Sequence, residues 1–341
     1  MGRYRPLKAI LYFSIWVGCN RDDAPAIKPV ASAPGGAASV GAVASTEARP
    51  PLDPRVEEQR LPVNLLVQQT SAYAAKVMAD TDAAYLFTEG AAYHLVPEGN
   101  PAEIRVEDGF LATTTSSSIV YHSKGSLLRV PKRGGKSEPL AKVQGRPQNL
   151  TSFGEELAWN ETPAKGTYVI QMLDTAGRAH RIHDGKGKIW SIVLGADQLV
   201  FLEVLGDAWR VGGVSRSGGV PRFAIDGEGH APSALVASEK IYFYEWKTKE
   251  VRRISFSLSE EEVVARGLDC RQLAVAARVY CANEAGFFEI SKQPNAHPHK
   301  IAAGANVTSL SVSATRLVWV SDFATGKLSV DMLPLLPTGA H

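Results

Sequence analysis

The sequence has few cysteines, little net charge and no long apolar run. Its 341 residues include three cysteines, and 37 basic residues are nearly balanced by 35 acidic ones, for a formal net charge of +2. Arg3, Arg5 and Lys8 lie in an N-terminal segment without acidic residues, so the rest of the chain is close to neutral. Because a near-neutral chain lacks the basic surface that binds a phosphate backbone, we predict no nucleic-acid binding.

Sequence motifs of several enzyme classes are also absent. No window of helical length has an apolar stripe at a 3.6-residue period, and no nucleophile elbow, zinc-protease helix or dinucleotide fingerprint occurs. The basic stretch GSLLRVPKRGGKSEPLA (125–141) is not a Walker loop, because that motif needs glycine five residues before Gly135, where Val130 stands. We therefore predict no catalytic residues and no cofactor from local motifs.

The eight histidines show no metal-ligand spacing. In HRIH (180–183), the alternation of a strand would place His180 and His183 on opposite faces, which disfavours shared ligation. The pair in HPH (297–299) has no third ligand nearby in the sequence. The sequence therefore predicts no metal site.

The N-terminal segment is typical of a signal peptide. A basic start, MGRYRPLK, precedes the apolar run AILYFSIWVG (9–18), which is too short to cross a bilayer as a helix. Cys19 follows at once, and IWVGC resembles the lipobox of bacterial lipoproteins. Gly18 matches that pattern, whereas Trp16 stands where an aliphatic residue is usual. We expect residues 1–18 to be removed and Cys19 to be lipidated; the alternative is an ordinary signal peptide or anchor.

A spacer and one folded domain follow. Residues 19–60 are rich in alanine, proline, glycine and serine, a composition that cannot bury enough apolar surface to fold. We interpret this segment as a flexible linker after the lipidated cysteine. The remaining residues, 61–341, form the predicted folded domain.

The predicted domain repeats one pattern of short apolar runs, each ending near an aromatic or equivalent marker residue. The markers are Tyr85, Tyr121, Trp159, Phe201, Phe243, Cys281 and Trp319. They are 36, 38, 42, 42, 38 and 38 residues apart, and three further strand-like runs accompany each. Four strands at a period near 40 residues are typical of a β-propeller blade. We predict an all-β propeller of seven four-stranded blades, with six blades as the alternative.

The predicted repeat explains the glycine-rich stretches. Gly134 and Gly218 are 84 residues apart, two 42-residue periods, and each lies after the aromatic marker of its unit. Both stretches are therefore predicted to be a third strand, a tight turn and a fourth strand. The last repeat lacks a good fourth strand, and the run LPVNLLVQQ (61–69) is unassigned. We expect this N-terminal run to pair into the last blade and close the ring.

The segments YLFTEG (85–90), VYHSKG (120–125) and VWVSDFATG (318–326) carry a family resemblance. They resemble propeller repeats that read Tyr-Trp-Thr-Asp followed by glycine, and periplasmic TolB-type propellers. The resemblance covers about residues 61–334 and implies an extracytoplasmic interaction domain. It transfers no catalytic residue, because the full four-residue motif does not occur here.

Cys270 and Cys281 lie in one predicted hairpin, CRQLAVAARVYC. With the turn at residues 274–277, the two cysteines fall directly opposite each other, where a disulfide can form. An oxidising compartment would permit this bond. The alternative is two buried free thiols.

Two sets of residues could form a binding face, on loops after second strands and between blades. Acidic residues recur after the markers: Glu89, Glu161, Glu203, Glu245, Glu284 and Asp322. Because they follow the repeat, we favour a structural role over a binding rim. The aromatics Trp190, Trp209, Tyr244 and Trp246 break the repeat. With Glu203 and Glu245 they form our candidate binding face, but for the aromatics we favour core packing between blades.

Together these features predict a non-enzymatic, membrane-anchored lipoprotein of the bacterial cell envelope, facing the periplasm or the cell exterior. Its propeller would bind an envelope protein or peptide, and we expect a monomer. The alternative is a hydrolase or lyase acting on glycans or peptides, with residues dispersed over several blades. Fold alone does not decide between them.

Overall fold

The computed structural model describes most of the chain beyond residue 75. The chain divides into two compact units, 1–49 and 50–341, and the described residues lie in the second. These residues are 59–60, 75–80, 83–88, 91–96, 102–106, 111–145, 147–304, 306–322 and 328–335. The predicted signal peptide, Cys19, nearly all of the predicted linker and the run 61–69 lie outside them.

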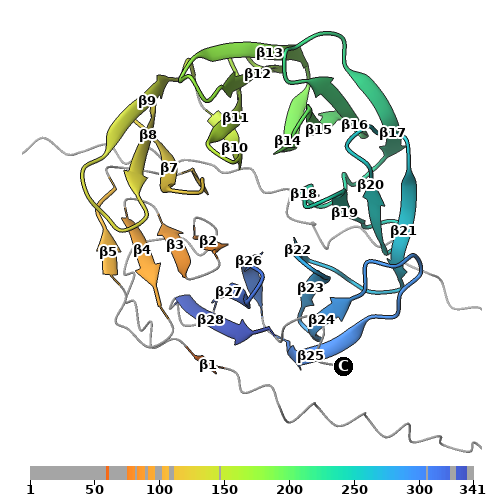
Figure 1. Cartoon of the computed structure of the whole chain (residues 1–341). Helices are drawn as coiled ribbons and strands as arrows, with labels where there is room; N and C mark the ends of the chain where they lie inside the picture. The colour runs from red at the N-terminus through yellow and green to blue at the C-terminus, as the bar shows by residue number, and fades with distance from the viewer. Residues whose placement is uncertain are drawn as a thin grey trace, which may run out of the picture. The chain divides into compact units, whose positions relative to one another are not determined.

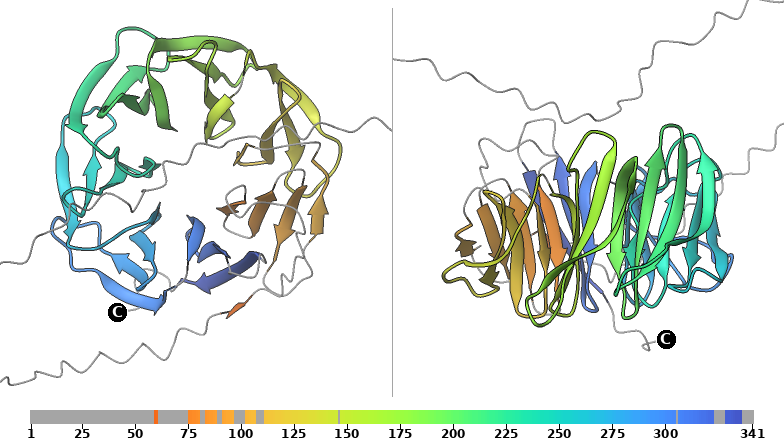
Figure 2. Two further views of the ribbon diagram at one scale, coloured as in Figure 1. Left: turned by 180° about the vertical axis from the view of Figure 1, so that it is seen from behind. Right: turned by 90° about the horizontal axis from the view of Figure 1, so that it is seen from above.

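The described residues of the second unit form seven four-stranded antiparallel sheets arranged as the blades of a ring (Figure 1). The prediction of an all-β seven-bladed propeller is confirmed, and the six-bladed alternative is wrong. Figure 2 shows the ring from behind and from above, with strands running between its two faces. Within blades 1 to 6, consecutive strands pair in chain order from the centre outward.

The strands of the first four blades have the following bounds. Blade 1 contains β2 (Lys76–Ala79), β3 (Ala84–Thr88), β4 (Ala91–Leu95) and β5 (Ala102–Ile104). Blade 2 contains β6 (Ala112–Thr114), β7 (Ser118–Ser123), β8 (Ser126–Pro131) and β9 (Glu138–Lys142). Blade 3 contains β10 (Pro147–Phe153), β11 (Glu156–Glu161), β12 (Thr167–Leu173) and β13 (Ala179–Lys186). Blade 4 contains β14 (Lys188–Leu194), β15 (Gln198–Leu205), β16 (Ala208–Ser215) and β17 (Arg222–Glu228).

The last three blades complete the ring. Blade 5 contains β18 (Val236–Ala237), β19 (Ile241–Glu245), β20 (Glu250–Ile254) and β21 (Glu261–Arg266). Blade 6 contains β22 (Gln272–Val275), β23 (Val279–Asn283), β24 (Gly286–Ile290) and β25 (His299–Ala303). Blade 7 contains β26 (Val307–Val312), β27 (Arg316–Asp322), β28 (Leu328–Pro334) and β1 (Gln59–Arg60).

The second strand of each blade explains the repeated apolar runs. All seven marker residues lie in second strands, and β3 and β7 are buried along their whole length. A second strand is covered on both faces by the neighbouring blades, so it reads as a continuous apolar run rather than an alternating one. Among the described residues, the buried apolar side chains accordingly form seven clusters, one between each pair of adjacent blades.

The glycine-rich stretches are turns between third and fourth strands, as predicted. Gly134 and Gly135, with φ of 84° and 132°, connect β8 to β9. Gly218 and Gly219, with φ of 88° and 125°, connect β16 to β17. Because non-glycine residues rarely adopt these angles, the double glycine is a requirement of the turn and not a phosphate-binding feature.

The ring is closed by an N-terminal strand. β1 is the outer strand of blade 7 and pairs with β28, with Arg60 opposite Asp331. The kind of closure is as predicted, but the strand lies just before the predicted run 61–69. Side chains add to the closure, because Ser309 and Ser311 of blade 7 accept hydrogen bonds from the backbone N–H groups of Val77 and Ala79 in blade 1, at 3.0 and 2.8 Å.

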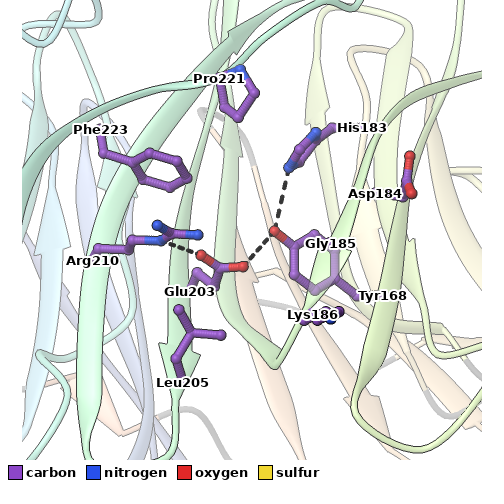
Figure 3. Close-up of a pocket in the computed structure, with 10 residues that line it drawn as sticks. All are labelled: Tyr168, His183, Asp184, Gly185, Lys186, Glu203, Leu205, Arg210, Pro221 and Phe223. Carbon is purple, nitrogen blue, oxygen red and sulfur yellow. Dashed lines mark hydrogen bonds and ion pairs between the residues drawn. The ribbon is translucent and has the colours of Figure 1, made fainter.

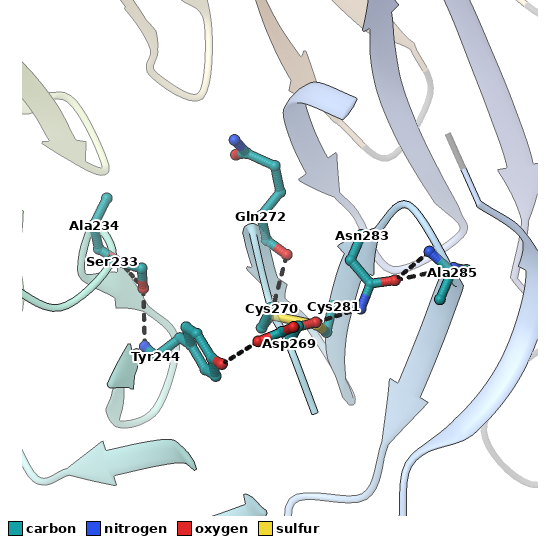
Figure 4. The surroundings of a disulfide bond; sticks show 10 residues. Ser233, Ala234, Tyr244, Asp269, Cys270, Gln272, Cys281, Asn283 and Ala285 are labelled. Atoms are coloured by element: carbon teal, nitrogen blue, oxygen red, sulfur yellow. Dashed lines mark hydrogen bonds between the residues drawn. A yellow bond between two sulfur atoms is a disulfide. The ribbon is translucent and has the colours of Figure 1, made fainter. Parts of the chain in front are cut away.

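Cys270 and Cys281 form a disulfide, with Cα atoms 5.4 Å apart (Figure 4). The predicted hairpin register is wrong, because Cys281 lies opposite Leu273 in the ladder, and β22 and β23 are joined by a tighter turn. Cys270 precedes β22, where the chain still runs close to β23, and Arg271 N–H bonds the Ala282 carbonyl at 3.1 Å. The bond therefore fixes the entry of the chain into blade 6.

Candidate functional site

The two faces of the ring carry different exposed side chains. We call the side where second strands turn into third strands, and where each blade leads to the next, the loop face. Trp190 near the start of β14, Leu205 at the end of β15 and Trp246 after β19 lie on the loop face. Phe153 and Val220 lie at the opposite face. Blades 4 and 5 therefore present a group of exposed apolar side chains on one face.

The structure places the four predicted aromatics in two different environments. Trp190 is 47% exposed and Trp246 is 37% exposed, whereas Trp209 and Tyr244 are buried at 4% and 0%. Trp209 packs in the core between blades 4 and 5, because alternation along β16 turns it away from blade 3. Core packing, the favoured interpretation, therefore describes Trp209 and Tyr244, and neither belongs to an exposed binding face.

Buried Tyr244 supports exposed Trp246. The two rings meet edge to face with centroids 4.9 Å apart. The Tyr244 hydroxyl donates to Asp269 at 3.3 Å, next to the disulfide (Figure 4). Burial, with the nearby Asp269 carboxylate, raises the pKa of Tyr244 to about 12, so the hydroxyl stays a donor at neutral pH. This contact gives Trp246 a fixed support within blade 5.

A pocket of about 400 Å³ lies beside this region, between blades 3 and 4 (Figure 3). Glu203 of β15, one of the predicted residues, lies within it and is only 1% exposed. Its Oε1 atom accepts a hydrogen bond of 2.7 Å from the hydroxyl of Tyr168 in β12. Its Oε2 atom pairs with Nε of Arg210 in β16. Both carboxylate oxygens are thus occupied, and the Tyr168 bond joins two blades.

Arg210 and Phe223 form one wall of the pocket. The guanidinium carbon lies 3.7 Å from the centroid of the Phe223 ring, a stacking contact that fixes the plane of the guanidinium. Phe223 reaches this place because Gly212 lies opposite it in β16 and leaves room for the ring. The Arg210 side chain remains 37% exposed, so it faces the pocket while Glu203 orients it.

His183 forms the opposite wall. Its Nε2 atom is 3.4 Å from the Tyr168 hydroxyl, and its ring stacks on Phe201 with centroids 5.6 Å apart. The predicted placement of His180 and His183 on opposite faces is wrong. A β-bulge in β13 turns both toward blade 4, where His180 Nε2 lies 3.3 Å from the Arg216 carbonyl.

His183 is expected to stay neutral at a lower pH than an ordinary histidine does. Burial lowers its pKa from 6.5, against the opposing effect of Asp184 and Glu203. The unfolded chain then binds the proton more readily, so the contribution of His183 to stability is present above about pH 6.5 and is lost as the pH falls below it. In an NMR titration, the signal that disappears in His183→Gln should have a midpoint below 6.5. A midpoint above 6.5 would contradict the assigned environment.

Other recurring acidic residues also have partners within the fold. Glu161 accepts the Trp159 indole N–H at 2.7 Å, Glu245 pairs with Arg252 at 2.8 Å, and Glu284 pairs with Arg271 at 2.8 Å. Glu89 and the side chain of Asp322 lie outside the described residues. The carboxylates that are described thus have the structural pairing that their recurrence suggested.

The repeated sequences DGKG (184–187) and DGEG (226–229) have a steric function. A Cβ atom on Gly185 would lie 2.5 Å from the Tyr168 hydroxyl, and one on Gly227 would overlap the Trp209 indole. Each glycine lies directly opposite that aromatic residue in the neighbouring strand. The motif therefore makes space for a large side chain on the third strand of its blade.

The described part of the chain has neither a metal-ligand cluster nor a membrane-spanning helix. Within it, no group of three or more histidine, cysteine or acidic residues could hold a metal ion. No helix long and apolar enough to cross a membrane occurs among the same residues.

No protein-family model matches the chain, and no curated protein sequence is significantly similar to it. Solved propellers do resemble it. An oligogalacturonate lyase in complex with manganese is 12% identical with a TM-score of 0.60, over 75% of this chain and 86% of the lyase. A puromycin-hydrolyzing peptidase of Mycobacterium tuberculosis is 15% identical with a TM-score of 0.54, over 79% of this chain and 54% of the peptidase. PorZ, a surface component of the type-IX secretion system of Porphyromonas gingivalis, is 15% identical with a TM-score of 0.50, over 77% of this chain and 38% of PorZ.

These likenesses define the class of protein and no more. The chain is a seven-bladed β-propeller, and structures at such low identity share the fold without transferring an activity.

Proposed function

We propose that this propeller is a non-enzymatic interaction module that binds another protein or a peptide through the loop face of blades 4 and 5. The observation that carries the proposal is the exposure of Trp190, Leu205 and Trp246 on that face. Large aromatic side chains provide much of the binding energy at protein interfaces. Lys188 Nζ lies 5.0 Å from the Trp190 ring centroid and adds a positive charge at the edge of this surface.

The pocket chemistry favours binding over hydrolysis. A glycoside hydrolase needs two carboxyl groups free to act in one cleft. Glu203 has both oxygens occupied, and Asp184 is paired with Arg181 at 2.5 Å. Glu203 is thus not available as a base without breaking these bonds, and Asp184 is held in an ion pair.

We further propose that the module belongs to the bacterial cell envelope, held at a membrane through lipidated Cys19 and the linker. The disulfide supports an oxidising compartment, because such bonds persist there and are rare in the cytosol. Mass spectrometry of the mature N-terminus tests the anchor. A lipidated Cys19 that is lost in Cys19→Ser supports it, and an unmodified N-terminus beyond residue 19 contradicts it.

The binding proposal is tested by crosslinking in native envelopes, affinity capture from a C-terminal tag, and mass spectrometry. We expect one dominant partner, whose yield falls about tenfold or more in a Trp190→Ser, Trp246→Ser double variant, because two interface aromatics are lost. The matched control is Phe153→Ser, Val220→Ser, which removes exposed apolar side chains from the opposite face. Equal losses in both variants, or no partner above a cytosolic control, would count against the proposal.

A further inference from the structure

The pocket between blades 3 and 4 has unused positive charge. Within the described residues, the terminal nitrogens of Arg210 have no acceptor and the Lys186 ammonium has no carboxylate partner, while Glu203 is occupied by Tyr168 and Arg210. Asp184 is compensated by Arg181. The charged residues of the lining balance in number, but Asp184 is paired with Arg181 outside the lining, so the Lys186 ammonium stays uncompensated. Guanidinium N–H donors of Arg210 also face the pocket (Figure 3).

Beside these charged groups, part of the pocket lining is apolar. Leu205, Pro221 and Phe223 lie around Arg210, and Leu205 is 36% exposed at the rim. A guanidinium held flat against a ring presents parallel N–H groups that match the two oxygens of a carboxylate. A ligand that fits has one carboxylate with an apolar group attached close to it.

We propose that this pocket binds the C-terminal residue of a peptide, with its free carboxylate on Arg210 and Lys186 and an apolar side chain against Leu205 and Phe223. A C-terminal residue carries its carboxylate and its side chain on the same carbon, which is the juxtaposition the lining offers. The rest of the peptide would extend toward Trp190 on the loop face. The inference rests on the proposed function and specifies the partner's chemistry.

Peptide binding by fluorescence anisotropy tests the inference. The probe is a fluorescein-labelled octapeptide of glycine and serine ending in leucine, compared with the same peptide as a C-terminal amide. We expect the free acid to bind about tenfold or more tightly than the amide, because the amide loses a charge-assisted contact. Equal affinity for the two peptides, or no binding of either, would overturn the proposal. Equally tight binding of N-acetyl-leucine alone would overturn the peptide as the source of the carboxylate.

Two variants locate the contact. Lys186→Gln should weaken the free-acid peptide about threefold to tenfold, and Arg210→Lys should weaken it further because lysine cannot bind both oxygens. The matched controls are Lys142→Gln, at the end of the fourth strand of blade 2, and Arg252→Lys, one 42-residue period after Arg210. Weakening by the controls as large as by the pocket variants would overturn the assignment.

The envelope crosslinking experiment separates this inference from the proposed function. Partner capture that persists in Lys186→Gln but is lost in the Trp190→Ser, Trp246→Ser variant means that the pocket inference fails and the proposed function stands. Selective binding of the free-acid peptide without any captured envelope partner means that the proposed function fails and the pocket chemistry stands. Loss of capture in both variants, with tight binding of the free acid, supports both.

Discussion

Replacing Trp209 by alanine is expected to lower the free energy of unfolding by about 3–5 kcal/mol, the range for removing a large aromatic from a core. Trp209 is 4% exposed and packs with Val211 and Ile225 between blades 4 and 5. Gly227 opposite it has no side chain that could fill the space. Urea unfolding followed by tryptophan fluorescence and circular dichroism measures the change.

The control for this prediction is Trp246→Ala. Trp246 is 37% exposed, so its removal should cost about 1 kcal/mol or less. A loss of stability at Trp246 as large as at Trp209 would contradict the division into one core and one surface tryptophan. The comparison therefore tests which aromatic residues are available to a partner.

The fold could be predicted from the sequence because its main signal is periodic. Second strands such as β15 are covered on both faces, so they read as apolar runs that recur every 36 to 42 residues. The turns at Gly134 and Gly218 repeat because the same double-glycine backbone geometry connects the third and fourth strands of blades 2 and 4. The sequence predicted that an N-terminal strand closes the ring, but not which residues form it, because β1 is a two-residue strand without a pattern of its own.

The candidate site was predictable only in part, because its contacts cross between blades. Glu203 was identified from its place after a marker, but its partner Tyr168 lies 35 residues earlier, on the third strand of another blade. Nothing in the local pattern pairs them. The DGKG sequence was a usable signal, because a glycine opposite a third strand indicates a large side chain there, and Tyr168 is that side chain.

Irregular backbone accounts for the remaining differences. The positions of His180 and His183 depend on a β-bulge, which changes the face of every later residue in a strand. The cysteine hairpin likewise has a shorter turn than its AVAA sequence suggested, so its ladder is shifted while the bond itself forms. The alternation of a regular strand predicts the wrong face after such a point, because the composition of the sequence does not reveal where one extra residue is inserted.

Replacing Glu203 by alanine is expected to lower the free energy of unfolding by about 2–4 kcal/mol. The buried Tyr168 hydroxyl loses its acceptor, which costs about 1–3 kcal/mol, and Arg210 loses its carboxylate partner. The cost stays below that of breaking a fully buried ion pair, because the Arg210 side chain is 37% exposed and can be solvated. Thermal and urea unfolding of the variant, with circular dichroism, measures the loss.

A double-mutant cycle shows whether this loss arises from the bond between blades 3 and 4. Tyr168→Phe should destabilise the wild-type protein by about 1 kcal/mol or more, and should cost much less when Glu203 is already alanine. Additive losses would mean that the two side chains act independently, and the carboxylate would then not join the blades. Strong coupling, in contrast, would mean that Glu203, which also pairs with Arg210, joins the two blades through Tyr168. A substitution of Glu203 would then also loosen the junction between blades 3 and 4. For this reason the binding tests replace Lys186 and Arg210 and leave Glu203 intact.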